Sequence, residues 1–184
     1  MLRASPAACL AAAALCAVAA GCGSASPSKD AGAAQLRSYI SLIEPIRLGV
    51  NSLLEGADPI LAARHEGRLG AAGAARRLGA LERRFAPYAV AIGALRPRSA
   101  RLAALNGSYA HTYVLEDAYL SALANGLAET RLDDLPDTSA TQREAIVAWR
   151  IGLEVIARED RVTLPHDVQQ AGRGEIRPAP EGGS

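Results

Sequence analysis

Cysteine is missing from most of this sequence. The three cysteines, Cys9, Cys16 and Cys22, all lie within the first 22 of the 184 residues. The chain beyond Cys22 therefore cannot form an internal disulfide. It also cannot supply thiolate ligands to a metal, a cysteine nucleophile, or the paired cysteines that attach haem. Packing alone must hold this part of the chain together, and its length predicts a single domain.

Lysine is scarce as well, and positive and negative charges nearly balance. Lys29 is the only lysine among the 20 basic residues, and the formal net charge is +1 with both signs mixed along the chain. A nucleic-acid-binding surface is usually marked by a clustered basic stripe, so we expect no nucleic-acid partner. Alternating runs of β-branched residues are almost absent, which disfavours a β-sheet.

The motifs of common catalytic and metal sites are also missing. The histidines, His65, His111 and His166, have no glutamate three residues before them and no second histidine four residues away. The sequence therefore has neither the Glu-x-x-His pair of di-iron bundles nor a His-Glu-x-x-His zinc motif. It also lacks a Gly-x-Ser-x-Gly nucleophile elbow. We expect no metal and no cofactor. An enzyme is the third of the functions considered, because sites assembled across a fold leave no local motif.

The chain begins with the pattern of an export signal. Arg3 provides a short positive start, and the run from Ala7 to Ala20 carries no charge. A bilayer-spanning helix needs about 20 apolar residues, so this run is short for a transmembrane segment. Small side chains at Ala19, Ala20 and Gly21 are typical of a signal-peptidase cleavage site.

The tetrad Ala19-Ala20-Gly21-Cys22 resembles the lipobox of bacterial lipoproteins. The resemblance implies a signal peptide over residues 1–21 and a lipid anchor on Cys22, formed by diacylglycerol and fatty acyl chains such as palmitate. Several acyl chains on one residue give stable membrane anchoring, at about 0.8 kcal/mol for each buried methylene. The protein is then expected at the extracytoplasmic face of the cell membrane. Ordinary secretion with cleavage near Gly21 remains the alternative.

Composition divides the remaining chain into three parts. Residues 22–33 are small and polar, which predicts a flexible tether. Residues 34–166 carry apolar side chains at steps of three and four and are expected to form the helical domain. The clearest core stripe in this domain consists of Leu78, Leu81, Phe85, Tyr88, Ile92 and Leu95. Residues 167–184 are rich in glycine, proline and charge, and we expect a disordered tail.

The helical periodicity predicts an all-α fold, an antiparallel up-down four-helix bundle with kinked first and second helices. Pro45 lies in the first helix and Pro87 in the second, where a missing backbone hydrogen bond favours a bend. The third helix is expected over residues 100–132 with Ser99 as its N-terminal cap, and the fourth is capped by Thr138 or Ser139. Long amphipathic helices joined by short turns are typical of such bundles.

A cluster of polar and aromatic residues on the third helix provides the candidate ligand site. Tyr109, Tyr113 and Glu116 share one face by their spacing, and Trp149 of the fourth helix is expected to form a wall of the same pocket. A buried carboxylate needs partners, for which the sequence offers the hydroxyls of Tyr109, Tyr113 or Tyr39, or the Arg150 guanidinium. The alternative, which the sequence favours, is that these rings simply fill the core.

These observations lead to two functions of different classes. The first is a membrane-anchored extracytoplasmic lipoprotein whose helical bundle is a binding or scaffolding module for an envelope protein. The second is a carrier of a small-molecule ligand, with its pocket between the third and fourth helices. An exposed apolar patch would favour the first, and an enclosed cavity lined by the aromatic residues would favour the second.

Overall fold

The structure, a computed structural model, describes residues 29–174 and Pro178, and over these residues it contains helices and no strand. The all-α class predicted from the sequence is confirmed. The helices are α1 (Lys29–Glu55), α2 (Asp58–His65), α3 (Ala71–Ala94), α4 (Ala100–Glu129), α5 (Ser139–Asp160) and α6 (His166–Gln170). The signal peptide predicted over residues 1–21, the acylation site Cys22 and most of the tether lie outside the described residues.

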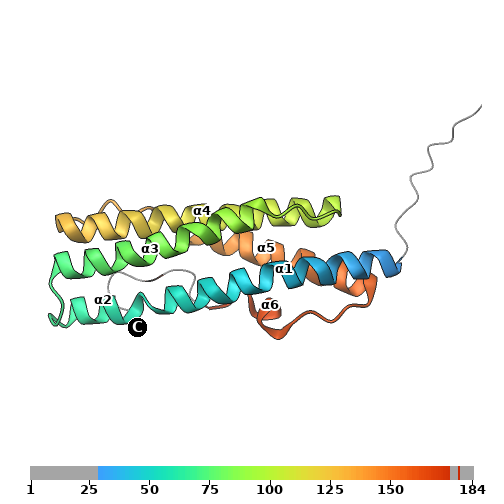
Figure 1. Cartoon of the computed structure of the whole chain (residues 1–184), viewed down its shortest axis with the longest axis horizontal. Helices are drawn as coiled ribbons and strands as arrows, with labels where there is room; N and C mark the ends of the chain where they lie inside the picture. Colours follow the sequence, from blue (N-terminus) through green and yellow to red (C-terminus); the bar gives the residue numbers. More distant parts are fainter. Residues whose placement is uncertain (1–28, 175–177, 179–184) are drawn as a thin grey trace, which may run out of the picture.

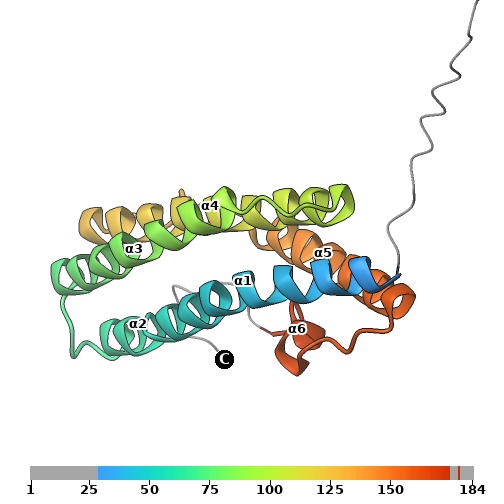
Figure 2. The same cartoon turned by 45° about the vertical axis from the view of Figure 1, so that its right-hand side comes forward.

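Four long helices make up the body of the molecule. The most extensive contact is between α3 and α4, followed by that between α4 and α5, and α1 packs on both α3 and α5 (Figure 1). Helix α2 continues the direction of α1, and α6 lies beside the middle of α1 (Figure 2). No helix of the described part is long and apolar enough to cross a membrane.

Local sequence signals explain where the longest helix begins and ends. The Ser99 hydroxyl accepts a hydrogen bond from the backbone N–H of Leu102, which caps the start of α4. Thr130 ends the helix in the left-handed conformation with φ of 57°. Helices α1 and α3 are continuous through Pro45 and Pro87, and the kinks predicted at these prolines stay predictions.

The apolar stripes of the four long helices meet in one core. In α3, the predicted stripe residues Leu78, Phe85 and Ile92 are fully buried, whereas Tyr88 is only partly covered. Full burial of such a side chain contributes about 1.5–3 kcal/mol relative to exposure. The fully buried side chains of the other three helices are Leu36 and Ile43 in α1, Leu102, Tyr119, Leu120 and Leu123 in α4, and Trp149 and Leu153 in α5.

Both predicted boundaries of the helical domain were too narrow. Residues 29–33, predicted as tether, belong to α1, and Ala33 is buried there. Alanine has the highest helix propensity but gives little hydrophobic periodicity, so this turn was not recognised. Residues 167–174, predicted as disordered tail, include most of α6 and the fully buried Val168.

Candidate functional site

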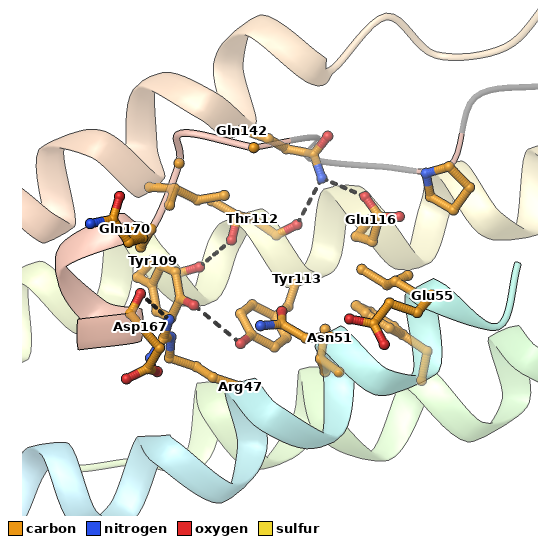
Figure 3. A pocket seen from close by; sticks show the side chains of 18 of the residues that line it. Arg47, Asn51, Glu55, Tyr109, Thr112, Tyr113, Glu116, Gln142, Asp167 and Gln170 are labelled. Atoms are coloured by element: carbon orange, nitrogen blue, oxygen red, sulfur yellow. Dashed lines mark hydrogen bonds and ion pairs between the residues drawn. The ribbon is translucent and has the colours of Figure 1, made fainter. Parts of the chain in front are cut away.

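A cavity of about 420 Å³ lies between α1, α4, α5 and residues 164–174, which we call the C-terminal strap. The carrier hypothesis predicted a pocket between α4 and α5 alone, whereas α1 and the strap also contribute walls (Figure 3). The polar side chains that line it are Arg47, Asn51 and Glu55 from α1, Asp58 from α2, Tyr109, Thr112, Tyr113 and Glu116 from α4, Gln142 from α5, and Asp167 and Gln170 from α6.

Glu116 lines the cavity from the interior, as its helical face predicted. Its side chain is only 4% exposed, and the Gln142 Nε2 amide donates a hydrogen bond of 2.8 Å to Oε2. The same amide also donates to the Thr112 carbonyl oxygen at 3.3 Å, while Thr138 donates to Gln142 Oε1 at 3.0 Å. Gln142 therefore holds the carboxylate in place between α4 and α5.

The partners expected for Glu116 make other contacts. Arg150 forms an ion pair of 3.1 Å with Glu154, one turn further along α5. The hydroxyls of Tyr109 and Tyr113 lie 3.3 Å apart and bond to each other. Gln142 was not among the predicted partners, although its four-residue spacing from Thr138 indicates that the two can interact across a helix start.

Tyr109 and Tyr113 form an aromatic wall of the cavity. Their rings meet edge to face with centroids 5.4 Å apart, and Tyr113 also stacks on Phe85 at 6.0 Å. Burial, together with the neighbouring Tyr109, raises the pKa of the Tyr113 hydroxyl well above its ordinary value. Tyr113 is therefore a neutral donor and acceptor at physiological pH.

Trp149 does not line the cavity, so its predicted role as a wall was wrong. Its ring stacks behind Tyr109 with centroids 4.1 Å apart and an interplanar angle of 13°. Its Nε1 donates a hydrogen bond of 3.0 Å to the Tyr39 hydroxyl, which donates in turn to Asn106 Oδ1 at 3.1 Å. Indole N–H groups need a partner when buried, and this chain of bonds fixes the ring that supports Tyr109.

Arg47 and Asp167 join α1 to the C-terminal strap at the cavity. Arg47 is only 5% exposed, and its Nη1 lies 2.5 Å from Asp167 Oδ2 while Nη2 donates to the Asp167 carbonyl oxygen at 3.2 Å. The guanidinium also lies over the Trp149 ring, 5.4 Å from its centroid. The sequence did not point to this pair, because arginines are abundant along the chain and Asp167 falls in the predicted tail.

Two further contacts hold the strap and Pro178, which lies beyond it. Arg143 Nη1 donates to the carbonyl oxygens of Gly172 and Gly174, at 3.2 and 3.0 Å. Gly172 has φ of +81°, and a Cβ atom there would lie 2.9 Å from Val147 Cγ2, so only glycine fits. The Tyr119 hydroxyl donates to the Pro178 carbonyl oxygen at 2.7 Å.

The described residues bring no group of three metal-binding side chains together. No protein-family model, curated protein or solved structure matches the chain. The cavity itself is therefore the basis for a function, and its wall includes a carboxylate, two tyrosines and an arginine that pairs with Asp167.

Proposed function

We propose that this protein is an extracytoplasmic lipoprotein, anchored through Cys22, whose helical domain binds a small-molecule ligand. Small-molecule sites are concave, measure roughly 300–1,000 Å³, and combine apolar walls with a few fixed polar groups. The cavity has this size and chemistry. The observation that carries the proposal is Glu116, a nearly buried carboxylate that lines the cavity and is held by Gln142.

The position of Glu116 favours binding over a purely structural role. Burial of a carboxylate costs several kcal/mol, and well-packed apolar side chains in place of a buried ionic group and its polar partners together are often neutral or stabilising. A carboxylate beside a cavity provides a fixed, directional group for a ligand. Of the four predicted ligand-binding residues, Tyr109, Tyr113 and Glu116 line the cavity, and Trp149 supports it from behind.

We also propose that α1, α3, α4 and α5 form the antiparallel up-down bundle expected from the sequence. Asn106 Nδ2 donates to the Ile92 carbonyl oxygen, and Tyr113 contacts Phe85, so position numbers rise along α4 as they fall along α3. Helices α4 and α5 are antiparallel by the same criterion, since Arg101 pairs with Glu159 and Glu116 with Gln142. Such a bundle places cavities between facing helices.

A scaffolding module for an envelope protein is the second candidate. It is favoured by large apolar side chains at the surface, among them Val90 at 72% and Val114 at 55% exposure. Single exposed apolar residues are common, so this support is weaker than the cavity. If a partner uses this surface, Val90→Ser will reduce photo-crosslinking to that partner in intact cells, whereas Glu116→Gln will leave it unchanged.

The anchor can be tested by metabolic labelling of host cells with an alkyne-bearing palmitate. The wild-type protein and Cys16→Ser are expected to take up the label, and Cys22→Ser is expected to lose it and stay unprocessed. Label retained on Cys22→Ser would refute the anchor.

The binding role can be tested by a native mass spectrum of the protein extracted gently from its host membrane. We expect a constant added mass beyond the acyl groups, which leaves on denaturation and is reduced in Glu116→Leu. A spectrum with acyl groups alone would contradict the binding role.

A further inference from the structure

Charged side chains are unevenly distributed over the surface of the domain. Within residues 71–128, which include α3 and nearly all of α4, every carboxylate is buried or half-buried. The exposed charged residues of this segment are all arginines, namely Arg76, Arg77, Arg83, Arg84, Arg96, Arg98 and Arg101. The net charge of +1 for the whole chain therefore includes one side that is locally basic.

Four of these residues, Arg76, Arg77, Arg83 and Arg84, make up what we call the arginine face of α3. Arg76 and Arg83 are seven residues apart, as are Arg77 and Arg84, so each pair lies on one side of the helix, about two turns apart. None of the four forms an ion pair with another described residue. Their charge is therefore available to anionic groups outside the domain.

Apolar and neutral surface adjoins the arginine face. Val90 follows Arg83 after a further seven residues and is 72% exposed. Helix α4 packs extensively on α3, and its exposed residues between positions 102 and 128 include Val114 and carry no arginine, lysine or carboxylate. An exposed carboxylate here would repel phosphate groups. Basic residues combined with apolar side chains are typical of surfaces that lie at a membrane interface.

The arginine face stands at one corner of the bundle. Helix α3 packs on α4 and α1, and α5 packs on the same two helices, so α3 and α5 occupy opposite corners. Helix α6 packs on α5 and lies beside α1, away from α4, in both views (Figure 1 and Figure 2). An extended anionic surface can therefore approach the arginine face without meeting the C-terminal strap.

The proposed lipid anchor holds the domain close to such a surface. Six residues separate Cys22 from Lys29, where α1 begins, and the seven steps between their Cα atoms span at most about 25 Å. Helix α1, with 27 residues, is itself about 40 Å long. The headgroups are thus nearer to the start of α1 than α1 is long. Each basic residue near an anionic lipid surface strengthens the attraction about fivefold.

We infer that the arginine face of α3 docks on anionic phospholipid headgroups, with Val90 at the lipid interface. This inference rests on the proposed anchor at Cys22 and adds to it the orientation of the domain on the membrane. It assigns Val90 to lipid, in place of the protein partner of the scaffolding alternative. The strap then faces away from the lipid, because it lies beside α5 and α1.

The absence of cysteine beyond Cys22 permits a label at one chosen position. Val90→Cys places a nitroxide beside the arginine face, and Ile151→Cys places it on α5, where the native side chain is 47% exposed. The full acylated chain is reconstituted into vesicles of phosphatidylcholine, with or without phosphatidylglycerol. Electron paramagnetic resonance then measures how accessible the nitroxide is to a water-soluble nickel chelate.

We expect phosphatidylglycerol to shield the label at position 90 and to leave the label at position 151 accessible. Salt at about 1 M should restore accessibility at position 90, because it shortens the Debye length to about 3 Å. Arg76→Gln combined with Arg83→Gln should weaken docking about 25-fold, fivefold for each charge. The matched control combines Arg37→Gln with Arg158→Gln, two exposed arginines of α1 and α5, and should dock like the wild type.

Three results would overturn the inference. An acylated chain whose label at position 90 is equally accessible in the two kinds of vesicle would refute the docking and leave the anchor intact. Shielding of position 90 in host membranes but not in phosphatidylglycerol vesicles would assign the surface to a protein partner. A purified chain whose intact mass lacks acyl groups would refute the anchor, and the inference would fail with it.

Discussion

Replacement of Arg47 by methionine should loosen the attachment of the C-terminal strap to α1. Arg47 donates two hydrogen bonds to Asp167 and lies over Trp149, and these contacts join α1 to α6. Methionine keeps much of the apolar stem but removes the charge and all donors. A helix as short as α6 has little stability of its own, so its position depends on such contacts.

The size of the effect follows from the burial of the two partners. Hydrogen bonds to a charged group contribute about 1.5–3 kcal/mol, and the lower end applies because Asp167 is 35% exposed and water can replace part of the loss. The contact of the guanidinium with Trp149 adds about 1 kcal/mol. The total of about 2.5 kcal/mol corresponds to hydrogen exchange that is about 60-fold faster in residues 164–174.

Hydrogen exchange followed by mass spectrometry measures the exchange rate of the strap directly. Urea unfolding followed by circular dichroism gives the change in the free energy of unfolding of the whole domain. The matched control is Arg101→Met, which removes an ion pair with Glu159 whose side chains are both more than half exposed. Such a pair contributes at most about 1 kcal/mol, so Arg101→Met should change the free energy of unfolding little and leave the exchange rate of the strap unchanged. If both variants had the same effect, or if strap exchange in Arg47→Met stayed at the wild-type rate, the reasoning about Arg47 would be refuted.

Three further predictions concern the cavity and the strap. Glu116→Leu should lower the free energy of unfolding in urea by about 1 kcal/mol, because the Gln142 amide loses the shorter of its two hydrogen bonds and keeps the one to the Thr112 carbonyl oxygen. Glu116→Gln keeps an acceptor and should change this free energy little; equal losses would contradict this. Gly172→Ala should destabilise the strap by about 1–2 kcal/mol and speed its hydrogen exchange accordingly, because φ of Gly172 is +81°. The matched control is Gly174→Ala, which has open space around Gly174 and should leave the exchange rate unchanged. Burial raises the pKa of the Tyr113 and Tyr39 hydroxyls above the ordinary value of about 10. Their contribution to the free energy of unfolding is therefore fully present below pH ~10, and it should be lost as the pH rises toward the pKa values of the folded state. Tyr113→Phe should make this fall shallower in urea titrations between about pH 9 and 11, and an unchanged slope would count against the burial argument.

The sequence predicted those features that depend on periodicity. Spacings of three and four placed Leu78, Phe85 and Ile92 on the buried face of α3, and the same rule turned Glu116 toward the interior. The Ser99 cap was also predicted, because capping depends on residues that are close in the chain. Local rules of this kind need no knowledge of the tertiary fold.

Features that depend on contacts between distant segments were missed. The strap has only a few apolar residues, and Val168 becomes fully buried because α6 packs on the rest of the domain. No local pattern pairs Arg47 with Asp167, which are 120 positions apart. Trp149 was expected to form a wall of the pocket, yet its hydrogen bond to Tyr39 holds it behind Tyr109.

The most direct test of the binding role is a crystal structure of the protein isolated from its host membrane without exchange of bound molecules. We predict electron density for a non-protein molecule in the cavity, in contact with the Tyr113 ring. A cavity that holds only ordered water in such crystals would contradict the proposal that this domain binds a small molecule.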